Sequence, residues 1–343
     1  MATLKDVAQK AGVTVTTVSR VLNNRGYISD KTRQKVMDAM REMNYQPNEM
    51  ARSLSKKNSN TIGVIVPHII HPYFAQMISC IEAEAERKDY KVLLCNSKQE
   101  KSTEEEYIEI CRKNRVSGLI LCGLPVDAGH FKRIDVPVVA IESGLQDATV
   151  SLTCDNKNGG YLAAKTLIEH GRRHLLYMTF EGDKGNIMPG DDRGNGFIEE
   201  CNRCGIEYQS AQINRASKGK GNNLGKLWDE EDTYMNSHWE TYIREALEKN
   251  PETDGIFVSN DLLAAQVLQV CNDMNIRVPQ DVSLVSFDDT YLASLLTPPV
   301  SSIHQPIREM AESAVNAIQQ YENGKTIPEK IILPVTLVER QSV

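Results

Sequence analysis

The sequence lacks any apolar run long enough to cross a membrane, and its first residues lack the hydrophobic segment of a signal peptide. Of its 343 residues, 41% are hydrophobic and 25% are charged, and no apolar stretch approaches the roughly 18 to 20 residues that a bilayer requires. We therefore expect a cytoplasmic protein. Collagen-like and wholly disordered chains are also excluded, because the composition supplies enough apolar side chains for a sizeable core.

Patterns typical of metal and disulfide sites are missing as well. The eight cysteines are spread over a long chain, mostly in apolar or helical segments, which is typical of reduced thiols. Only Cys201 and Cys204 have the spacing Cys-x-x-Cys, and without a second pair two incidental thiols are favoured over a zinc site. His68 and His71 lack further ligands nearby. We expect no metal and no cofactor.

Enzyme motifs are absent too. There is no Gly-x-Ser-x-Gly nucleophile elbow, and the glycine-rich residues 219–226 miss the spacing of a phosphate-binding loop. No segment supplies a nucleophile, a base and oxyanion donors together. The sequence therefore favours a binding protein over an enzyme, while the role of the loop at residues 214–237 stays open.

Charge is unevenly distributed along the chain. Residues 1–58 contain 11 basic and five acidic side chains, a net charge of +6. Because the whole chain has a net charge of −7, the other 285 residues have a net charge of −13. Basic side chains that neutralise phosphates supply most sequence-independent affinity for nucleic acid. A small DNA-binding head before a large acidic body is the expected organisation, and the length predicts two or three folding units.

Three helices are predicted within residues 1–46. Apolar residues at helical spacing begin at Leu4 and stop at Gly12, which can take the left-handed conformation that ends a helix. Thr14 can cap a second helix and Ser29 a third. A helix, a tight turn and a second helix form a helix-turn-helix domain, whose second helix enters the major groove of DNA. The alternative is a plain three-helix bundle with an incidental basic face.

On this geometry the second helix reads the DNA. Val15, Thr16 and Arg20 are expected to face base edges, where arginine can bind guanine at two positions. The hydroxyl and amide side chains better placed for backbone phosphates are those of Thr14, Thr17, Ser19 and Asn23.

Residues 47–59 are predicted to be a hinge helix followed by a polar linker. Residues 48–55 could form two helical turns, with Arg52 available to a phosphate. So short a helix is marginal in water, because isolated helices below about 12 residues rarely form. Two copies side by side could pack together or insert Leu54 into the minor groove, so the segment is a candidate switch.

Residues 60–343 alternate buried strands with amphipathic helices, a pattern typical of a doubly wound parallel sheet, at least twice over. We expect two α/β lobes. The predicted N-lobe comprises about residues 60–160 plus 291–322, and the predicted C-lobe about 161–290 plus 323–343. Ligands of such sheets bind beyond the carboxyl ends of the strands, in a cleft between facing lobes.

Candidate ligand contacts lie at predicted strand ends and helix starts. Tyr73 and the aromatic Phe74 follow the first strand, Asn156 and Arg193 stand at the starts of predicted helices, and Asn260 and Asp288 follow later strands. Carboxylate, amide and guanidinium groups pair with adjacent hydroxyls, while an aromatic ring covers an apolar face, so this set suits a polyol such as a sugar. The alternative is that the Asp and Asn residues only cap helices.

The motifs together resemble those of the LacI/GalR family of bacterial transcription repressors. The similar segments of the head and hinge are residues 3–13, 17–23, 31–36, 44–48 and 51–54, and those of the body are 72–74, 155–160, 193–197, 259–261, 287–289 and 298–306. The resemblance implies base reading by Val15, Thr16 and Arg20, minor-groove insertion by Leu54, and effector contacts from Phe74, Arg193, Asn260 and Asp288, with Tyr73 and Asn156 beside them. Cys122 replaces a commonly polar residue, so the effector stays open.

We therefore expect a homodimeric repressor that binds a near-palindromic operator in double-stranded DNA and responds allosterically to a small molecule, with a sugar as the leading candidate. The alternative within the family is a regulator that needs a co-repressor or a partner protein. A solute-binding protein with the same two lobes is a further alternative.

Overall fold

The computed structural model describes residues 2–22, 26–45, 59–97, 101–123, 135–143, 145, 148–180, 189–213 and 237–343. The chain forms two compact units, Met1–Ser59 and Asn60–Val343. Within the described residues, no helix combines the length and the apolar character needed to span a membrane.

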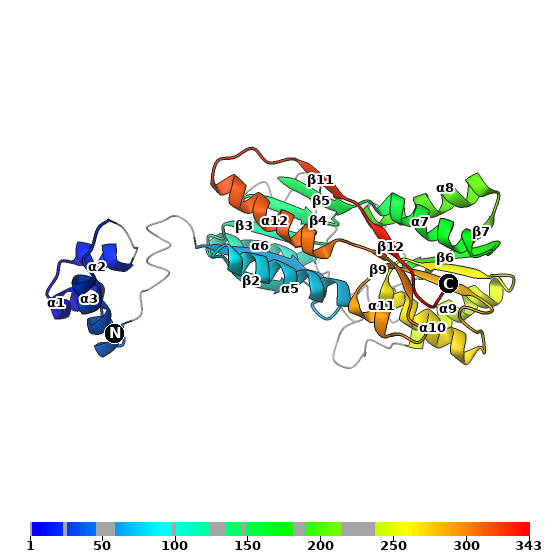
Figure 1. Ribbon diagram of the computed structural model, residues 1–343, viewed down its shortest axis with the longest axis horizontal. Helices are drawn as coiled ribbons and strands as arrows, with labels where there is room; N and C mark the ends of the chain where they lie inside the picture. The colour runs from blue at the N-terminus through cyan, green and yellow to red at the C-terminus, as the bar shows by residue number, and fades with distance from the viewer. Residues whose placement is uncertain are drawn as a thin grey trace. The chain divides into compact units, whose positions relative to one another are not determined.

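The first unit contains the three predicted helices, α1 (Leu4–Ala11), α2 (Val15–Leu22) and α3 (Asp30–Glu42) (Figure 1). Gly12 ends α1 with a φ of 66°, as expected for a left-handed cap. The Ser29 hydroxyl begins α3 by accepting a hydrogen bond from the Thr32 amide at 3.3 Å. Apolar side chains from all three helices form one small core, whose buried members are Val7, Ala8, Ala11, Val18, Val21, Val36 and Ala39. The packing of these helices leaves one side of α2 exposed.

The second unit contains two six-stranded sheets, as predicted. The first has the order β11-β5-β4-β3-β1-β2 and the second β12-β10-β9-β8-β6-β7. The first-sheet strands are β1 (Thr61–Val66), β2 (Lys91–Asn96), β3 (Gly118–Cys122), β4 (Val138–Ile141), β5 (Val150–Cys154) and β11 (Lys330–Leu333). The second-sheet strands are β6 (His174–Phe180), β7 (Glu207–Ile213), β8 (Gly255–Val258), β9 (Ser283–Asp288), β10 (Ser301–His304) and β12 (Thr336–Val338). All the pairings are parallel except β10 with β12, which is antiparallel.

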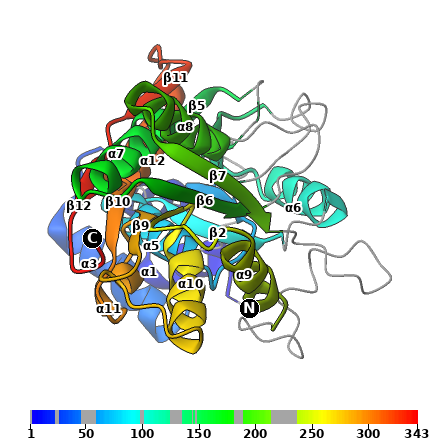
Figure 2. The same ribbon diagram turned by 90° about the vertical axis from the view of Figure 1, so that its right-hand side faces the viewer.

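Helices cover both faces of each sheet, which defines two lobes (Figure 2). In the first lobe α5 (Pro72–Arg87) and α12 (Ile307–Glu322) pack on one face and α6 (Lys101–Lys113) on the other. In the second lobe α9 (Ser237–Lys249) and α10 (Asp261–Asp273) pack opposite α7 (Asn156–Glu169) and α8 (Asp192–Cys204). Two short helices, η2 (Pro189–Asp191) and α11 (Tyr291–Leu295), complete the second lobe.

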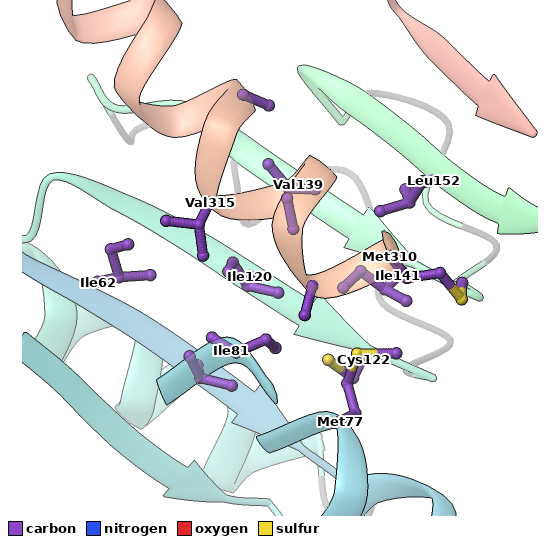
Figure 3. Close-up of a cluster of buried hydrophobic side chains, with 14 of the residues drawn as sticks. Ile62, Met77, Ile81, Ile120, Cys122, Val139, Ile141, Leu152, Met310 and Val315 are labelled. Carbon is purple, nitrogen blue, oxygen red and sulfur yellow. The ribbon is translucent and has the colours of Figure 1, made fainter. Parts of the chain in front are cut away.

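The core of the first lobe joins segments that are far apart in the sequence. Met77 and Ile81 of α5 and Val315 of α12 meet Ile120 and Val139 of the sheet (Figure 3). Helix α12, more than 200 residues after α5 in the chain, is therefore part of the first lobe.

The predicted division of the last 50 residues between the lobes is right for α12 and β12 but wrong for β10 and β11. Ser301–His304, expected in the N-lobe, pairs with β9 in the second sheet, and Lys330–Leu333, expected in the C-lobe, pairs with β5 in the first. The chain thus crosses between the lobes three times, near residues 155, 305 and 334. A short apolar run indicates a strand but not its partner, since pairing is decided by distant residues.

Three strands have no counterpart in the sequence-based prediction: residues 299–343 were expected to contain two strands and contain three, and the other two unpredicted strands are β7 and β5. The edge strand β7 (Glu207–Ile213) is mostly polar and largely exposed, so it has neither an apolar run nor a clean alternation. Strand β5 (Val150–Cys154) is five residues long and is buried at four of its positions. Such short segments cannot be told from loops or helix starts by their periodicity alone.

Candidate functional sites

The exposed side of α2 is the candidate DNA interface. Val18 and Val21 face the core, so Val15, Thr16 and Arg20 point away from it and are exposed. The side chain of Val15 is large and apolar, yet 39% of its surface is exposed. The structure thus presents the three predicted base-reading residues together on one surface.

The predicted phosphate contacts have other partners within the head. The Thr14 hydroxyl caps α2 by accepting a hydrogen bond from the Thr17 amide at 3.1 Å, and the two hydroxyls lie 2.9 Å apart. Ser19 is half-buried. Asn23, Arg52 and Leu54, with the predicted hinge helix, lie outside the described residues, so their roles stay predictions.

A cluster of buried polar side chains lies at the boundary between the two lobes of the body. We call it the boundary cluster; its members are Glu142, Asn156, Arg193, Asp288 and Gln305. They come from the carboxyl ends of β4 and β9, from the first residues of α7 and α8, and from the crossing that follows β10. This is the edge at which parallel sheets bind ligands.

Arg193 is the centre of this cluster. Its Nε donates to Asn156 Oδ1 at 2.8 Å, and one Nη donates to the Ser259 carbonyl at 2.5 Å. The same Nη lies 3.6 Å from Asp288 Oδ1. The guanidinium plane lies over the Phe287 ring, 3.7 Å from its centroid, an arrangement that only arginine makes while donating in several directions. Three predicted residues, Asn156, Arg193 and Asp288, are thus brought together.

Asn156 connects Arg193 to the first lobe. Its amide nitrogen donates to Glu142 Oε2 at 2.9 Å, and Glu142 Oε1 accepts hydrogen bonds from the Cys154 amide at 2.6 Å and the Thr153 hydroxyl at 2.8 Å. Glu142 has a φ of 47°, so its backbone takes the uncommon left-handed conformation directly after β4. Glu142 was missed by the sequence-based prediction. The only signal was an acidic residue directly after a buried strand.

Asp288 is almost fully buried, and the cations around it do not offset the cost of burying its charge. Burial raises the pKa of its carboxyl group well above the usual range; nearby Arg193 opposes this rise, and the charges of Asp261 and Glu142 add to it. Asp288 Oδ1 accepts a hydrogen bond from Gln305 Nε2 at 2.7 Å. The Arg193 guanidinium is disfavoured by burial, but Asp288 and the other acidic neighbours outweigh this and raise its pKa.

Two buried oxygen atoms of this region have no hydrogen-bond partner among the described residues: the hydroxyl of Tyr73 and Oε1 of Gln305. Burial raises the pKa of Tyr73 well above its usual value, with smaller contributions from Glu142 and from Asp288 across the boundary, so the hydroxyl keeps its proton and is a donor. Leaving such a group unpaired costs about 1–3 kcal/mol. Gln305 also went unpredicted, because it follows a strand that had been assigned to the other lobe.

The side chains of Phe74 and Asn260, two further predicted effector contacts, have different surroundings. The half-buried ring of Phe74 lies 5.3 Å from the Tyr73 ring and against Gly123, where a Cβ atom would come within 2.7 Å of it. Asn260 caps α10, because its Oδ1 accepts a hydrogen bond from the Leu263 amide at 2.9 Å. Asn260 thus caps a helix, and its contact with an effector stays a prediction; the backbone carbonyl of its neighbour Ser259 accepts a hydrogen bond from Arg193.

Glycines place Arg193 by letting α7 and α8 approach closely. A Cβ atom on Gly160 would lie 1.8 Å from the Arg193 carbonyl oxygen, and one on Gly196 would lie 1.8 Å from the Lys157 carbonyl oxygen. Any side chain at either position would push the helices apart. The glycines of the motifs at 155–160 and 193–197 therefore have a packing reason.

A metal centre is not assembled in the described part of the chain, where no group of three or more His, Cys, Asp or Glu side chains is arranged to hold an ion. Cys201 is buried and Cys204 is exposed near the end of α8.

Each lobe contributes polar atoms to the boundary cluster, and these atoms suit a neutral, hydroxyl-rich molecule.

Comparison with family models matches three parts of the chain. Residues 3–48 match the model described as bacterial regulatory proteins, lacI family, and residues 59–224 match periplasmic binding proteins and sugar binding domain of LacI family. Residues 164–343 match a periplasmic binding protein-like domain. Together these matches cover the head and both lobes.

Characterised relatives and solved structures agree. The chain is similar over its whole length to the sucrose operon repressor of Streptococcus mutans, at 31% identity and full coverage of both chains. It is 33% identical to the ribose operon repressor of Bacillus subtilis, covering 98% of that protein. Both relatives are repressors rather than enzymes.

Among solved structures, the body is similar to a periplasmic binding protein/LacI transcriptional regulator from Alkaliphilus metalliredigens complexed with D-xylulofuranose. The identity is 28% and the TM-score 0.69, with 82% of this chain and 98% of that chain covered. The fold of the whole chain is similar to that of the lac repressor, with a TM-score of 0.81 at 24% identity over 99% of this chain and 98% of that one. The chain therefore belongs to the LacI family of bacterial regulatory proteins and is a DNA-binding transcriptional regulator.

Proposed function

We propose that this regulator is a repressor whose operator affinity is controlled by an uncharged sugar bound at the boundary cluster. The observation that carries the proposal is a pair of buried oxygens without a hydrogen-bond partner among the described residues: Tyr73 Oη, from the first lobe, and Oε1 of Gln305, whose Nε2 binds Asp288. One is a donor and the other an acceptor, so a hydroxyl-bearing ligand satisfies both. The Phe74 ring beside them suits the apolar face of a sugar.

The printed names of the relatives point to the same class of effector. Two are repressors of sucrose and ribose operons, and one solved structure contains D-xylulofuranose. These sugars differ in size, so we propose the class of effector for this chain and not an individual sugar.

The DNA side of the proposal assigns base contacts to Val15, Thr16 and Arg20, with Thr14, Thr17, Ser19, Asn23 and Arg52 near phosphates and Leu54 in the minor groove. A homodimer that acts in the cytoplasm would present two heads to a near-palindromic operator, because two-fold symmetry of the protein requires it in the DNA. The exposed apolar side chains of Tyr291 and Leu295, four residues apart on α11, suit contact with a second copy.

The proposed allosteric step is a change in the distance between the two hinge segments when a sugar joins the lobes. Arg193, Asn156 and Asp288 belong to the second lobe or its first helix, whereas Tyr73 and Glu142 belong to the first. A sugar that contacts both sets would favour one arrangement of the lobes, and the change in DNA affinity can be no larger than its differential affinity for the two arrangements.

Fluorescence anisotropy with operator DNA tests the proposal. The candidate operators are near-palindromic sequences close to the regulator's own gene, and the panel contains D-ribose, D-fructose, D-glucose and sucrose. We expect at least one sugar to change operator affinity by tenfold or more. A loss of affinity identifies an inducer and a gain identifies a co-repressor. No change with any sugar, in a protein that binds its operator specifically, would contradict a sugar effector, and sedimentation velocity tests the dimer.

A further inference from the structure

We propose that Asp289 is a positioning residue of the effector site: through His304 and Arg340 it holds its neighbour Asp288, and with it Gln305, in the orientation that a ligand needs. This inference rests on the proposed function, because it concerns the same site. Asp289 lies in the segment 287–289 directly after Asp288, and its carboxylate contacts His304 and Arg340.

The backbone at Asp288 and Asp289 takes an unfavourable conformation. Their φ angles are 106° and 54°, two consecutive non-glycine residues in a region that L side chains rarely adopt. Such a conformation persists only where surrounding contacts hold it, and it is enriched at ligand sites and switches. The side chains of both residues are nearly buried, with 5% and 10% of their surface exposed.

Contacts from two other segments hold Asp289. His304 Nδ1 lies 2.9 Å from Asp289 Oδ2, and one Nη of Arg340 donates to Oδ1 at 2.5 Å. The Asp289 amide donates to the Ser302 hydroxyl at 3.0 Å. Both carboxylate oxygens and the backbone amide are thus occupied by groups that follow Asp289 in the chain by 13 residues or more.

The same turn holds Gln305 through Asp288. Gln305 Nε2 donates to Asp288 Oδ1 at 2.7 Å, and the Gln305 amide donates to the Asp288 carbonyl at 3.2 Å. Two successive residues at the end of β9, Asp288 and Asp289, therefore bind two successive residues at the end of β10, Gln305 and His304 respectively. If the Asp289 carboxylate is removed, we expect the turn that carries both residues to be held less firmly, and the hydrogen bonds between Asp288 and Gln305 to weaken with it.

Arg340 extends this arrangement to the third crossing between the lobes. It follows β12, and its other Nη donates to the Val300 carbonyl at 2.7 Å while its amide donates to the Ser301 hydroxyl at 2.8 Å. Asp289 thus contacts both the end of β10, just before the second crossing, and Arg340, which follows the third. We expect a movement of the lobes about these crossings to displace Asp289. Because one peptide bond joins the two residues, Asp288 would be displaced with it.

A merely stabilising ion pair would behave differently from a positioning residue. The chain offers a control in Asp281, which lies before β9 and seven residues ahead of Asp288; its Oδ1 also lies 2.5 Å from an Nη of its partner, Arg277, in a more exposed pair than that of Asp289 and Arg340. Removing Asp281 costs its pair with Arg277, and removing Asp289 costs its contacts with Arg340 and His304. Only the loss of Asp289 is expected to change the orientation of Asp288 and Gln305.

Hydrogen exchange without any ligand is the first measurement. In Asp289→Ala we expect the amides of Thr290 and Gln305 to exchange at least tenfold faster than in the wild type, with β6 and β8 unchanged. Asp281→Ala should leave these two amides unchanged. Asp289→Asn keeps an acceptor oxygen for Arg340 and tolerates a positive φ, so it should recover most of the protection. Unchanged exchange in Asp289→Ala, or equal acceleration in Asp281→Ala, would overturn the proposal.

Sugar binding is the second measurement, by calorimetry with D-ribose, D-fructose, D-glucose and sucrose. Any of these sugars that binds the wild type should bind Asp289→Ala at least tenfold more weakly and Asp289→Asn with intermediate affinity, while operator affinity without sugar stays within twofold. Equal sugar affinity in Asp289→Ala would overturn the positioning role. If the wild type binds none of them, the sugar proposal fails, and the exchange result alone decides the role of Asp289.

Discussion

The guanidinium group of Arg193 lies over the ring of Phe287, with 3.7 Å between the guanidinium carbon and the ring centroid. The two residues start from different elements, since Arg193 is the second residue of α8 and Phe287 precedes the end of β9. The stacking leaves the edge of the guanidinium free to donate to Asn156 and to the Ser259 carbonyl. The arrangement depends on a planar cation with donors at its rim.

Replacing Arg193 by lysine should therefore remove the effector response although the charge is kept. An ammonium group cannot stack on Phe287 and reach both acceptors, so we expect a loss of roughly 1–3 kcal/mol of stability from the unpaired groups and no change of operator affinity when sugar is added. Thermal unfolding and anisotropy measure the two effects. The control is Arg112→Lys, which changes an exposed pair with Glu109; a normal sugar response in Arg193→Lys would contradict the assigned role.

Tyr73→Phe separates binding from folding. The hydroxyl has no partner among the described residues, so its removal should leave Tm unchanged or slightly higher, whereas sugar affinity should fall about tenfold or more, the equivalent of one hydrogen bond. Calorimetry on the purified protein measures the affinity. In the comparison variant Tyr177→Phe, a buried tyrosine of β6 loses its hydroxyl, and sugar affinity should be unaffected. Unchanged affinity in Tyr73→Phe would place this hydroxyl outside the site.

Asp288→Asn should stabilise the protein while it abolishes the effector response. Because burial raises the pKa of Asp288 in the folded chain, the protonated form is favoured there, and the stabilisation present at low pH is lost as pH rises toward the folded-state pKa. The asparagine variant does not titrate, so its advantage in Tm, a few degrees, should grow between pH 4 and pH 8.

Asp281→Asn gives the opposite sign. The Arg277 side chain and amide hold the pKa of Asp281 at about 2, so its carboxylate stabilises the folded state above the unfolded pKa, and the substitution should lower Tm at neutral pH or leave it unchanged. Calorimetric scans at pH 4, 5, 6, 7 and 8 compare the two variants. A lower Tm for Asp288→Asn at pH 7 would mean that attraction to Arg193 outweighs the burial of the carboxylate.

Gly160→Ala should disrupt the body more than an ordinary glycine substitution does. The new methyl group would lie 1.8 Å from the Arg193 carbonyl oxygen, and overpacking of this kind costs about 1–3 kcal/mol or more. Gly324→Ala meets no atom within 4 Å and suffers only from its φ of 68°, a cost of about 1 kcal/mol. Urea unfolding gives both values. Equal losses would show that α7 and α8 can separate without penalty.

Arg20→Ala tests the DNA interface. If Arg20 contacts a base, affinity for the operator should fall by roughly 1–3 kcal/mol while affinity for random DNA changes little. Arg41→Ala, on the exposed side of α3 and paired with Asp38, is the control and should leave specificity intact. Equal losses on operator and random DNA would instead identify Arg20 as a phosphate contact.

Much of the fold followed from local pattern. The helices of the head, their caps at Gly12, Thr14 and Ser29, and most strands of the body were predicted because hydrophobic periodicity and capping chemistry act over a few residues. The three exposed residues of α2 followed from the same periodicity. Strand β7 was missed because a polar edge strand has no such pattern.

The candidate effector site was predicted only in part. Polar residues at strand ends correctly indicated Asn156, Arg193 and Asp288 as one cluster. Asn260 was indicated by the same rule, yet its side chain caps α10, since strand ends are also helix starts and local sequence does not separate the two roles. Glu142 and Gln305 needed knowledge of which strands adjoin.

Local sequence therefore sufficed for the class of fold, the DNA-reading helix and the kinds of side chain at the strand ends. Folding in three dimensions alone selected their partners: Arg193 meets groups 37 and 66 residues away, and β10 and β11 exchange lobes relative to the prediction. The physical reason is range. Periodicity and capping depend on neighbours in the chain, whereas strand order and buried hydrogen bonds depend on which distant segments bury each other's surfaces.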